Sequence, residues 1–320
     1  MAGSTAIDPA LVERFREALD RLNPQGGKLG LAVSGGPDSM AMLLLAQEAI
    51  PGGFEVATVD HGLRPEAKDE CALVVAACEE RGVRCEVLSV EVGEGNVQAQ
   101  AREARYRALA DWAKRRGLPA IATAHHADDH AETLLMRLNR GSGLSGLAGV
   151  REQGWTPSRL RRLIRPLLRF RRAELRSLAE AGIRFVDDPS NADDRFDRSR
   201  LRKALANADW LDIEAVAASA RHLADADSAL EWCTNLLRET HCYADRGVYG
   251  IEKPQRLPRL LQLSFVEEGL NEFGGVARGG QVAELVKHLL AGRGGNLAGV
   301  MVSVEDGNWV FRPEPPRRTG

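Results

Sequence analysis

The segment from Ser34 to Ser39 has the residue types of a loop that binds phosphate. It reads Ser-Gly-Gly-Pro-Asp-Ser and lies between an apolar stretch and the start of a predicted helix. Backbone N–H groups and the helix dipole at a helix N-terminus favour a phosphate, and paired glycines let the backbone approach it. Serine hydroxyls add donors, whereas a carboxylate repels phosphate and suits Mg²⁺. We therefore predict that ATP binds Ser34, Gly35, Gly36, Pro37, Asp38 and Ser39, and that Asp38 is a magnesium ligand and a catalytic residue.

Two other interpretations of this loop are weaker. The Gly-Lys-Ser/Thr ending of a kinase-type P-loop is missing, which excludes that class of nucleotide site. A glycine turn without a ligand is the second alternative, because short glycine loops are common. The apolar stretch, the helix, both serines and the aspartate together favour the nucleotide.

A second polar segment, Ala124 to Thr133, begins where another apolar stretch ends. Asp129 and Glu132 are three residues apart, so they share one helix face and are predicted to hold Mg²⁺ against the phosphates of ATP. His125 lies at the strand end and is expected to face the nucleotide. A zinc site is the competing interpretation, but the spacing and the lack of a fourth ligand do not match known arrangements. Acids that complement a helix dipole are the simplest alternative.

Two further segments offer groups for a nucleotide. Arg102 and Arg105 lie three apart on one face of a predicted helix, where they either clamp phosphates or face solvent. Asp60 and His61 follow a predicted strand, at the position where such folds contact adenosine, so we expect both in the ATP site.

The elements that must position these residues alternate between strand and helix. Strands are predicted at 29–33, 54–59, 83–90 and 120–124, and helices at 11–22, 40–48, 66–80, 96–116 and 128–138. This alternation predicts an α/β fold with a doubly wound, Rossmann-like parallel sheet, whose ligands lie at the carboxyl ends of the strands. The polar segments would then meet at one edge of the sheet.

After Gly141 the predicted pattern loses its strands and becomes basic and helical, with helices at 172–181 and 198–206. Nine arginines but only two glutamates lie between residues 151 and 176, a pattern of either a solvated surface or a phosphate-binding one. A long helix at 212–240 precedes a helix at 282–291 and strands at 300–304 and 309–312. We predict a catalytic domain at 1–212, with a basic helical appendage from about 150, and a smaller α+β domain at 213–320, for which the family resemblance described below implies a tRNA contact.

The bulk composition is that of a cytoplasmic protein with no membrane span. The chain has 320 residues, 44% of them hydrophobic, which is enough for two domains, and its formal charge of −2 excludes a uniformly basic protein. Its apolar stretches are too short for a membrane, and no signal peptide is evident. Five cysteines without a CxxC pair fit a reducing compartment.

Together these segments resemble the tRNA(Ile)-lysidine synthetase family of PP-loop ATP pyrophosphatases. The resemblance spans most of residues 29–203 and rests on SGGPDS, HGLR, AREARYRAL, AHHADDHAETLLMRLNRGSGLSGLAG, RPLL at 165–168 and DDPSN at 187–191. One departure is visible at 198–202, where the chain reads Arg-Ser-Arg-Leu-Arg and the family usually reads Arg-Asn-Arg-Ile-Arg. The length resembles the compact form with one C-terminal domain.

The resemblance implies ATP-dependent ligation of free lysine to C2 of the wobble cytidine 34 in the CAU anticodon of tRNA(Ile). The cytidine would be adenylated first, and AMP and pyrophosphate would be released with Mg²⁺ as cofactor. Arg105 and His125 are the implied catalytic residues beside the adenylate. RNA recognition of this kind splays loop bases while arginines hold the backbone. The expected tRNA contacts are Arg165, Arg169, Arg171, Arg198 and Arg202.

Other functions remain open on the sequence. A PP-loop tRNA thiolase would share the ATP chemistry but would need reactive cysteines, and none of the five adjoins the motifs. A non-catalytic module that senses ATP or docks RNA is the other alternative. A monomer and a homodimer are both compatible with the sequence.

Overall fold

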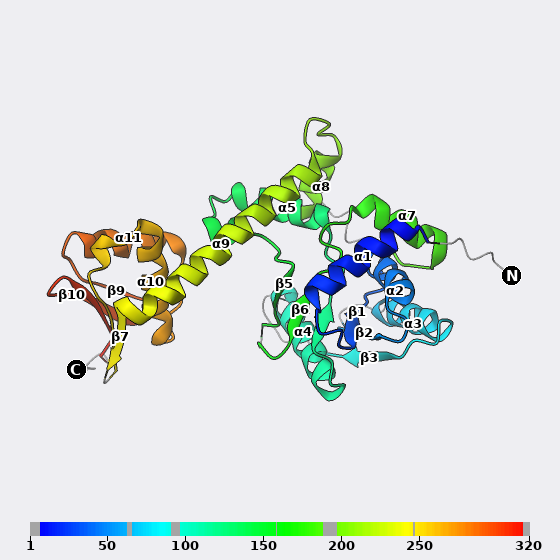
Figure 1. Cartoon of the computed structure of the whole chain (residues 1–320), viewed down its shortest axis with the longest axis horizontal. Helices are drawn as coiled ribbons and strands as arrows, with labels where there is room; N and C mark the ends of the chain where they lie inside the picture. The colour runs from blue at the N-terminus through cyan, green and yellow to red at the C-terminus, as the bar shows by residue number, and fades with distance from the viewer. Residues whose placement is uncertain are drawn as a thin grey trace. The chain divides into compact units, whose positions relative to one another are not determined.

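The computed structural model describes residues 7–62, 66–90, 97–157, 159–187, 197–245 and 247–315. The chain forms two compact units (Figure 1). The first takes the residues up to 222 apart from 143–145, and the second takes 143–145 and the residues from 223 onward. The division at 222 falls within helix α9 (Ile213–His241), which begins in the first unit and ends in the second.

A six-stranded sheet forms the centre of the first unit. Its strands follow the order β3-β2-β1-β4-β6-β5, and every neighbouring pair is parallel except β5 and β6, which are antiparallel. The bounds are β1 (Leu29–Ala32), β2 (Phe54–Asp60), β3 (Cys85–Ser89), β4 (Ala120–Ala122), β5 (Gln153–Trp155) and β6 (Arg162–Ile164). The predicted doubly wound α/β fold is therefore confirmed.

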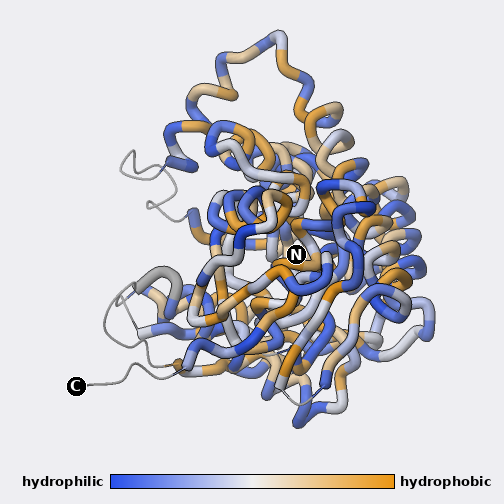
Figure 2. The backbone as a smooth tube through the Cα atoms, turned by 90° about the vertical axis from the view of Figure 1, so that its left-hand side faces the viewer, coloured by the Kyte–Doolittle hydropathy of each residue, from blue (hydrophilic) through white to orange (hydrophobic). Residues whose placement is uncertain are grey.

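Helices cover both faces of this sheet. They are α1 (Pro9–Leu22), α2 (Pro37–Ala49), α3 (Glu66–Glu79), α4 (Val97–Arg115) and α7 (Arg172–Gly182). Helix α5 (Ala127–Leu138) packs against α8 (Asp197–Ala206), and a short α6 (Leu144–Leu147) lies between α5 and β5. Successive strand residues point to opposite faces. Ala120 and Ala122 accordingly join the core formed with α1, α2, α3 and α7, whereas Ile121 packs with Trp112 of α4. Figure 2 shows hydrophobic and hydrophilic residues interspersed along the backbone.

The prediction that strands end after Gly141 was wrong. Strands β5 and β6 form inside the arginine-rich stretch, and β6 pairs in parallel with β4. Leu163 and Ile164 are buried there, whereas Arg162 lies only partly in the interior. A strand of three residues beside so many arginines has too little apolar periodicity to stand out from sequence. Because β6 belongs to the sheet, Arg165 directly follows a sheet strand and does not lie on a helical appendage.

The second unit contains an antiparallel sheet with strand order β7-β8-β11-β10-β9. The strands are β7 (Cys242–Asp245), β8 (Val248–Ile251), β9 (Gly295–Leu297), β10 (Val300–Glu305) and β11 (Asn308–Pro313), with helices α10 (Arg259–Glu272) and α11 (Gly279–Leu290). Phe265 of α10 and Trp309 and Phe311 of β11 are fully buried in its core. The predicted helix at 282–291 and the last two strands are confirmed, whereas α10 and β7 to β9 were not predicted. Within the described ranges, no helix is both long and apolar enough to cross a membrane.

Candidate functional site

The glycine loop joins β1 to α2 at the carboxyl edge of the sheet. Gly36 is the N-cap of α2, and its cap position has no side-chain hydrogen bond. Ser39 stabilises the loop from inside, because its hydroxyl donates to the carbonyl of Gly36 at 2.9 Å and accepts from the N–H of Ser34 at 3.1 Å. The N–H groups of the first helical turn have no partner within the helix. They are thus available to an anion in front of the loop.

Two glycines keep this front open. Gly35 has φ +85°, a conformation that favours glycine, and its carbonyl accepts from the N–H of Val186 at 2.9 Å. A Cβ on Gly36 would meet nothing closer than the Ser34 hydroxyl, 3.8 Å away. The empty space beside Gly36 leaves room for a phosphate near the backbone, and the contact itself stays a prediction.

Asp38, His126 and Asp129 meet beside the loop. The Nε2 atom of His126 lies 3.5 Å from Oδ2 of Asp38 and 3.5 Å from Oδ2 of Asp129. His126 is 1% exposed and caps α5, where its Nδ1 accepts from the N–H of Asp129 at 3.3 Å. An accepting Nδ1 assigns the proton of the neutral ring to Nε2, which therefore points at both carboxylates. Sequence reasoning named His125 and missed His126, because histidine is not among the residues that usually mark a helix N-cap.

The carboxylates of Asp38 and Asp129 fit a magnesium ion. Oδ1 of Asp38 is buried and has no hydrogen-bond partner among the described residues, so a cation could bind this oxygen. Across those residues, no group of three His, Cys, Asp or Glu side chains is spaced to hold a metal ion. The protein thus offers two acidic groups, and phosphate and water would have to complete the coordination.

Glu132, the third expected ligand, lies in an arginine cluster. Its side chain is 2% exposed. Oε1 accepts from Arg202 Nε at 2.7 Å and from Arg172 Nη2 at 3.0 Å, and Oε2 accepts from Arg198 Nε at 2.6 Å. Arg198 also donates to Oδ1 of Asp129 at 2.8 Å. In this structure both Glu132 oxygens therefore bind arginines, and Arg198 and Arg202 tie α8 to α5.

A second group of arginines surrounds His125 and Tyr106. The guanidinium groups of Arg102 and Arg105 lie over the Tyr106 ring, 4.9 and 5.1 Å from its centre. Nδ1 of His125 lies 2.9 Å from the Thr123 hydroxyl. Burial and then the charge of Arg165 lower the pKa of His125 to about 3, although Asp129 opposes the shift. The imidazole is consequently neutral at physiological pH and lies beside cations.

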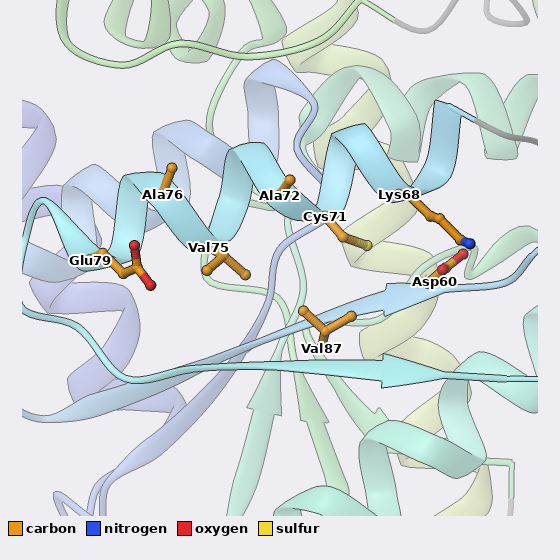
Figure 3. A pocket seen from close by; sticks show the side chains of 8 residues that line it. All are labelled: Asp60, Lys68, Cys71, Ala72, Val75, Ala76, Glu79 and Val87. Carbon is orange, nitrogen blue, oxygen red and sulfur yellow. The ribbon is translucent and has the colours of Figure 1, made fainter.

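The other residues expected in the ATP site, Asp60 and His61, lie at the end of β2. Asp60 ends β2, where its Oδ1 accepts from the N–H of Gly62 at 2.9 Å, and His61 follows it. A pocket of about 380 Å³ opens between α3 and strands β2 and β3, and Figure 3 shows Lys68 and Asp60 close together at one end of it. Residues 63 and 64 of the HGLR segment and 188–191 of the DDPSN segment lie outside the described residues.

The expected tRNA contacts Arg169 and Arg171 are paired with acids. Arg169 Nε donates to Glu152 at 2.8 Å, and its side chain is 54% exposed. Arg171 Nη2 lies 3.3 Å from Asp128, whose other oxygen accepts from the N–H of Arg172 at 2.8 Å. Glu152 belongs to the same arginine-rich stretch as Arg169, whereas Asp128 brings a negative charge to Arg171 from another part of the chain.

Known proteins are similar to this chain over most of its length. The family model described as a PP-loop domain matches residues 8–209. A tRNA(Ile)-lysidine synthase from Novosphingobium aromaticivorans is 48% identical over 311 residues, which cover 96% of this chain and 94% of that protein. One from Zymomonas mobilis is 38% identical over 95% and 94% of the two chains. A U34-tRNA thiolase NcsA from Methanococcus maripaludis, solved with its 4Fe-4S cluster, aligns over 68% of this chain and 78% of its own. Its TM-score of 0.55 and 19% identity show a shared fold alone.

Proposed function

The chain belongs to the PP-loop domain family, among the tRNA(Ile)-lysidine synthases, and we propose that it ligates free lysine to C2 of cytidine 34 in the CAU anticodon of tRNA(Ile). The observation that carries this proposal is the meeting of a glycine loop, the Asp38–His126–Asp129 group and a cluster of arginines at one edge of the sheet. Such a site can bind ATP and stabilise charge that develops during adenylation.

The reaction needs ATP because a ring carbonyl is a poor electrophile. In the proposed first step the C2 oxygen of cytidine attacks the α-phosphorus of ATP, and the bond to pyrophosphate breaks. In the second step the amine of lysine attacks C2, the C2–O bond breaks, and AMP leaves with that oxygen while the amine loses protons. The base oxygen thus becomes part of a good leaving group.

Asp38 and Asp129 are the residues that would hold Mg²⁺, which would offset the charge of the departing pyrophosphate. The orphaned Oδ1 of Asp38 and the shared contact with His126 support this assignment. Glu132 was expected as a third ligand. We now propose that it positions Asp129, because both of its oxygens accept hydrogen bonds from arginines.

Arg105 and His125 are our catalytic candidates. The arginines beside His125 disfavour any further positive charge, and they already hold this imidazole neutral. The same field would lower the pKa of a lysine ammonium that enters the site, from its ordinary value of about 10.4, and would help to form the free amine that attacks.

We propose that tRNA contacts the arginine-bearing surface of the first unit. Arg169 is the best placed of the expected contacts, because more than half of its side chain is exposed. Arg198 and Arg202 hold α8 against α5 through Glu132 and Asp129. Reversing the charge of Arg169 should weaken tRNA binding and reduce its salt dependence, and unchanged affinity would contradict this placement.

A tRNA thiolase is the alternative within the same fold, and the cysteines argue against it. All five thiols are free, and Cys71 is buried in the first unit, where burial raises the pKa of its thiol. Cys78 is also buried, and a hydrogen bond with Cys85 lowers its pKa, so its burial alone argues against a nucleophile. A buried thiol of raised pKa is a poor nucleophile.

One assay separates these functions. The protein is incubated with ATP, Mg²⁺, labelled lysine and a CAU-anticodon tRNA(Ile) transcript, and the nucleosides are analysed. Label in one nucleoside, formed together with AMP and pyrophosphate, supports the proposal. Modification without lysine would favour thiolation, and no release of pyrophosphate would favour a binding module. A tRNA(Met) transcript with the same anticodon tests discrimination, and size-exclusion chromatography decides between monomer and homodimer.

A further inference from the structure

Arg102, Arg105 and Arg165 differ from the other arginines of the site in their partners. Arg172, Arg198 and Arg202 all bind Glu132. Within the described ranges, Arg102, Arg105 and Arg165 form no ion pair. Arg165 follows β6, and one of its nitrogens donates to the carbonyl of Arg151 at 2.6 Å.

Tyr106 lies at the centre of these three residues. It is 1% exposed, and the guanidinium groups of Arg102 and Arg105 lie over its ring. Burial opposes ionisation of its hydroxyl, yet the charges of Arg105, Arg102 and Arg165 lower its pKa below the ordinary value. All three cations therefore act on one buried phenol.

Two polar atoms in this group are buried without a hydrogen-bond partner among the described residues, Oη of Tyr106 and Nε of Arg165. Leaving such atoms unpaired costs about 1–3 kcal/mol each, so native structures rarely do so without a ligand or water. Arginine is also the side chain whose geometry best matches phosphate. Within the part of the chain that the structure describes, three arginines without an ion pair therefore lie beside two buried N–H and O–H groups without a hydrogen-bond acceptor. Such a combination is typical of a site that binds an anion.

We propose that Arg102, Arg105 and Arg165, arranged around Tyr106, form a phosphate-binding site at the carboxyl edge of β4 and β6. Arg165 is thereby assigned to the reaction centre rather than to the outer RNA surface. The phosphate belongs either to ATP or to the RNA backbone. A phosphate of the RNA backbone rests on the proposed function, whereas a phosphate of ATP requires only that the glycine loop binds the nucleotide.

Three variants and a matched control test the site. Arg165→Gln removes one charge, Arg165→Lys keeps it without the guanidinium fork, and Tyr106→Phe removes only the buried hydroxyl. Arg107→Gln is the control, because Arg107 lies on the same helix, is 66% exposed and pairs with Glu103 at 3.0 Å. Calorimetry measures the Kd of ATP with Mg²⁺, and filter binding measures the Kd of the tRNA transcript over a range of salt. Melting temperature reports the fold.

We expect Arg165→Gln to weaken one of the two ligands roughly tenfold or more, since hydrogen bonds to charged groups contribute about 1.5–3 kcal/mol. Tyr106→Phe should weaken the same ligand without lowering the melting temperature, and Arg165→Lys should restore part of the affinity. If tRNA is the ligand, the salt slope of Arg165→Gln should also fall by about one.

The proposed phosphate site would be overturned if Arg165→Gln bound both ATP and tRNA with affinities within about twofold of those of the Arg107→Gln control. If Arg165→Gln does not fold, Arg165→Lys and Tyr106→Phe decide by the same criterion. These are binding measurements, so they are separate from the proposed function. A protein that binds phosphate through Arg165 but forms no lysine-modified nucleoside would retain this site and lose that function.

Discussion

Replacing Glu132 by glutamine removes the negative charge at the centre of the arginine cluster and changes little in size. Three guanidinium groups would then share only the carboxylate of Asp129, because Arg172, Arg198 and Arg202 all donate to Glu132 at 2.6–3.0 Å. Breaking a buried ion pair typically costs 3–5 kcal/mol. Each arginine keeps contact with water, so we expect the lower end, about 3 kcal/mol of the free energy of unfolding.

Urea denaturation followed by circular dichroism, in EDTA, measures this loss. Glu103→Gln is the matched control, since Glu103 is 60% exposed and pairs with Arg107 alone. That pair should contribute less than about 0.5 kcal/mol. The reasoning is refuted if Glu132→Gln lowers the free energy of unfolding no more than Glu103→Gln does. A Glu132→Gln variant with unchanged stability but weaker Mg²⁺ binding would instead restore Glu132 as a metal ligand.

Three further predictions concern the loop and two titrating groups. Gly36→Ala should keep its stability, because a Cβ there meets only the Ser34 hydroxyl at 3.8 Å, but calorimetry should show weaker ATP binding. The pKa of His125 is lowered to about 3, so its contribution to stability should fall as pH drops from about 6.5 toward 3, and NMR should show a neutral ring at pH 5. Arg116 lowers the pKa of Glu55 to about 2, so this pair should stabilise the fold above pH 4.5 and lose its effect between pH 4.5 and 2. Glu55→Gln should remove that slope in acid denaturation.

The edge of the sheet could be predicted because its signals are local. Apolar strands followed by glycine, serine or acidic residues define strand ends, and a parallel sheet brings those ends together. Asp38 and Asp129 were placed by this logic, and the structure brings both to His126. The strands β1 to β4 were also predicted from local signals, because each is an apolar stretch of consecutive residues.

What the sequence did not reveal depends on pairing between distant residues. Nothing in the local sequence shows that Glu132 binds Arg198 and Arg202, which are 66 and 70 residues away. Both arginines were expected to contact tRNA, yet each forms an ion pair with this glutamate. Strand β6 was missed because its three residues lie among arginines, and its pairing with β4 gives it its position. The orphaned Oη of Tyr106 was likewise invisible before packing was known.

The fate of the cytidine oxygen tests the central claim most directly. A CAU-anticodon tRNA(Ile) transcript carrying ¹⁸O at C2 of cytidine 34 is incubated with the protein, ATP, Mg²⁺ and lysine, and the AMP released is analysed by mass spectrometry. Adenylation of the base oxygen predicts one ¹⁸O atom in AMP for each lysine incorporated. AMP without ¹⁸O, or lysine incorporated while the label stays in the tRNA, would contradict the account.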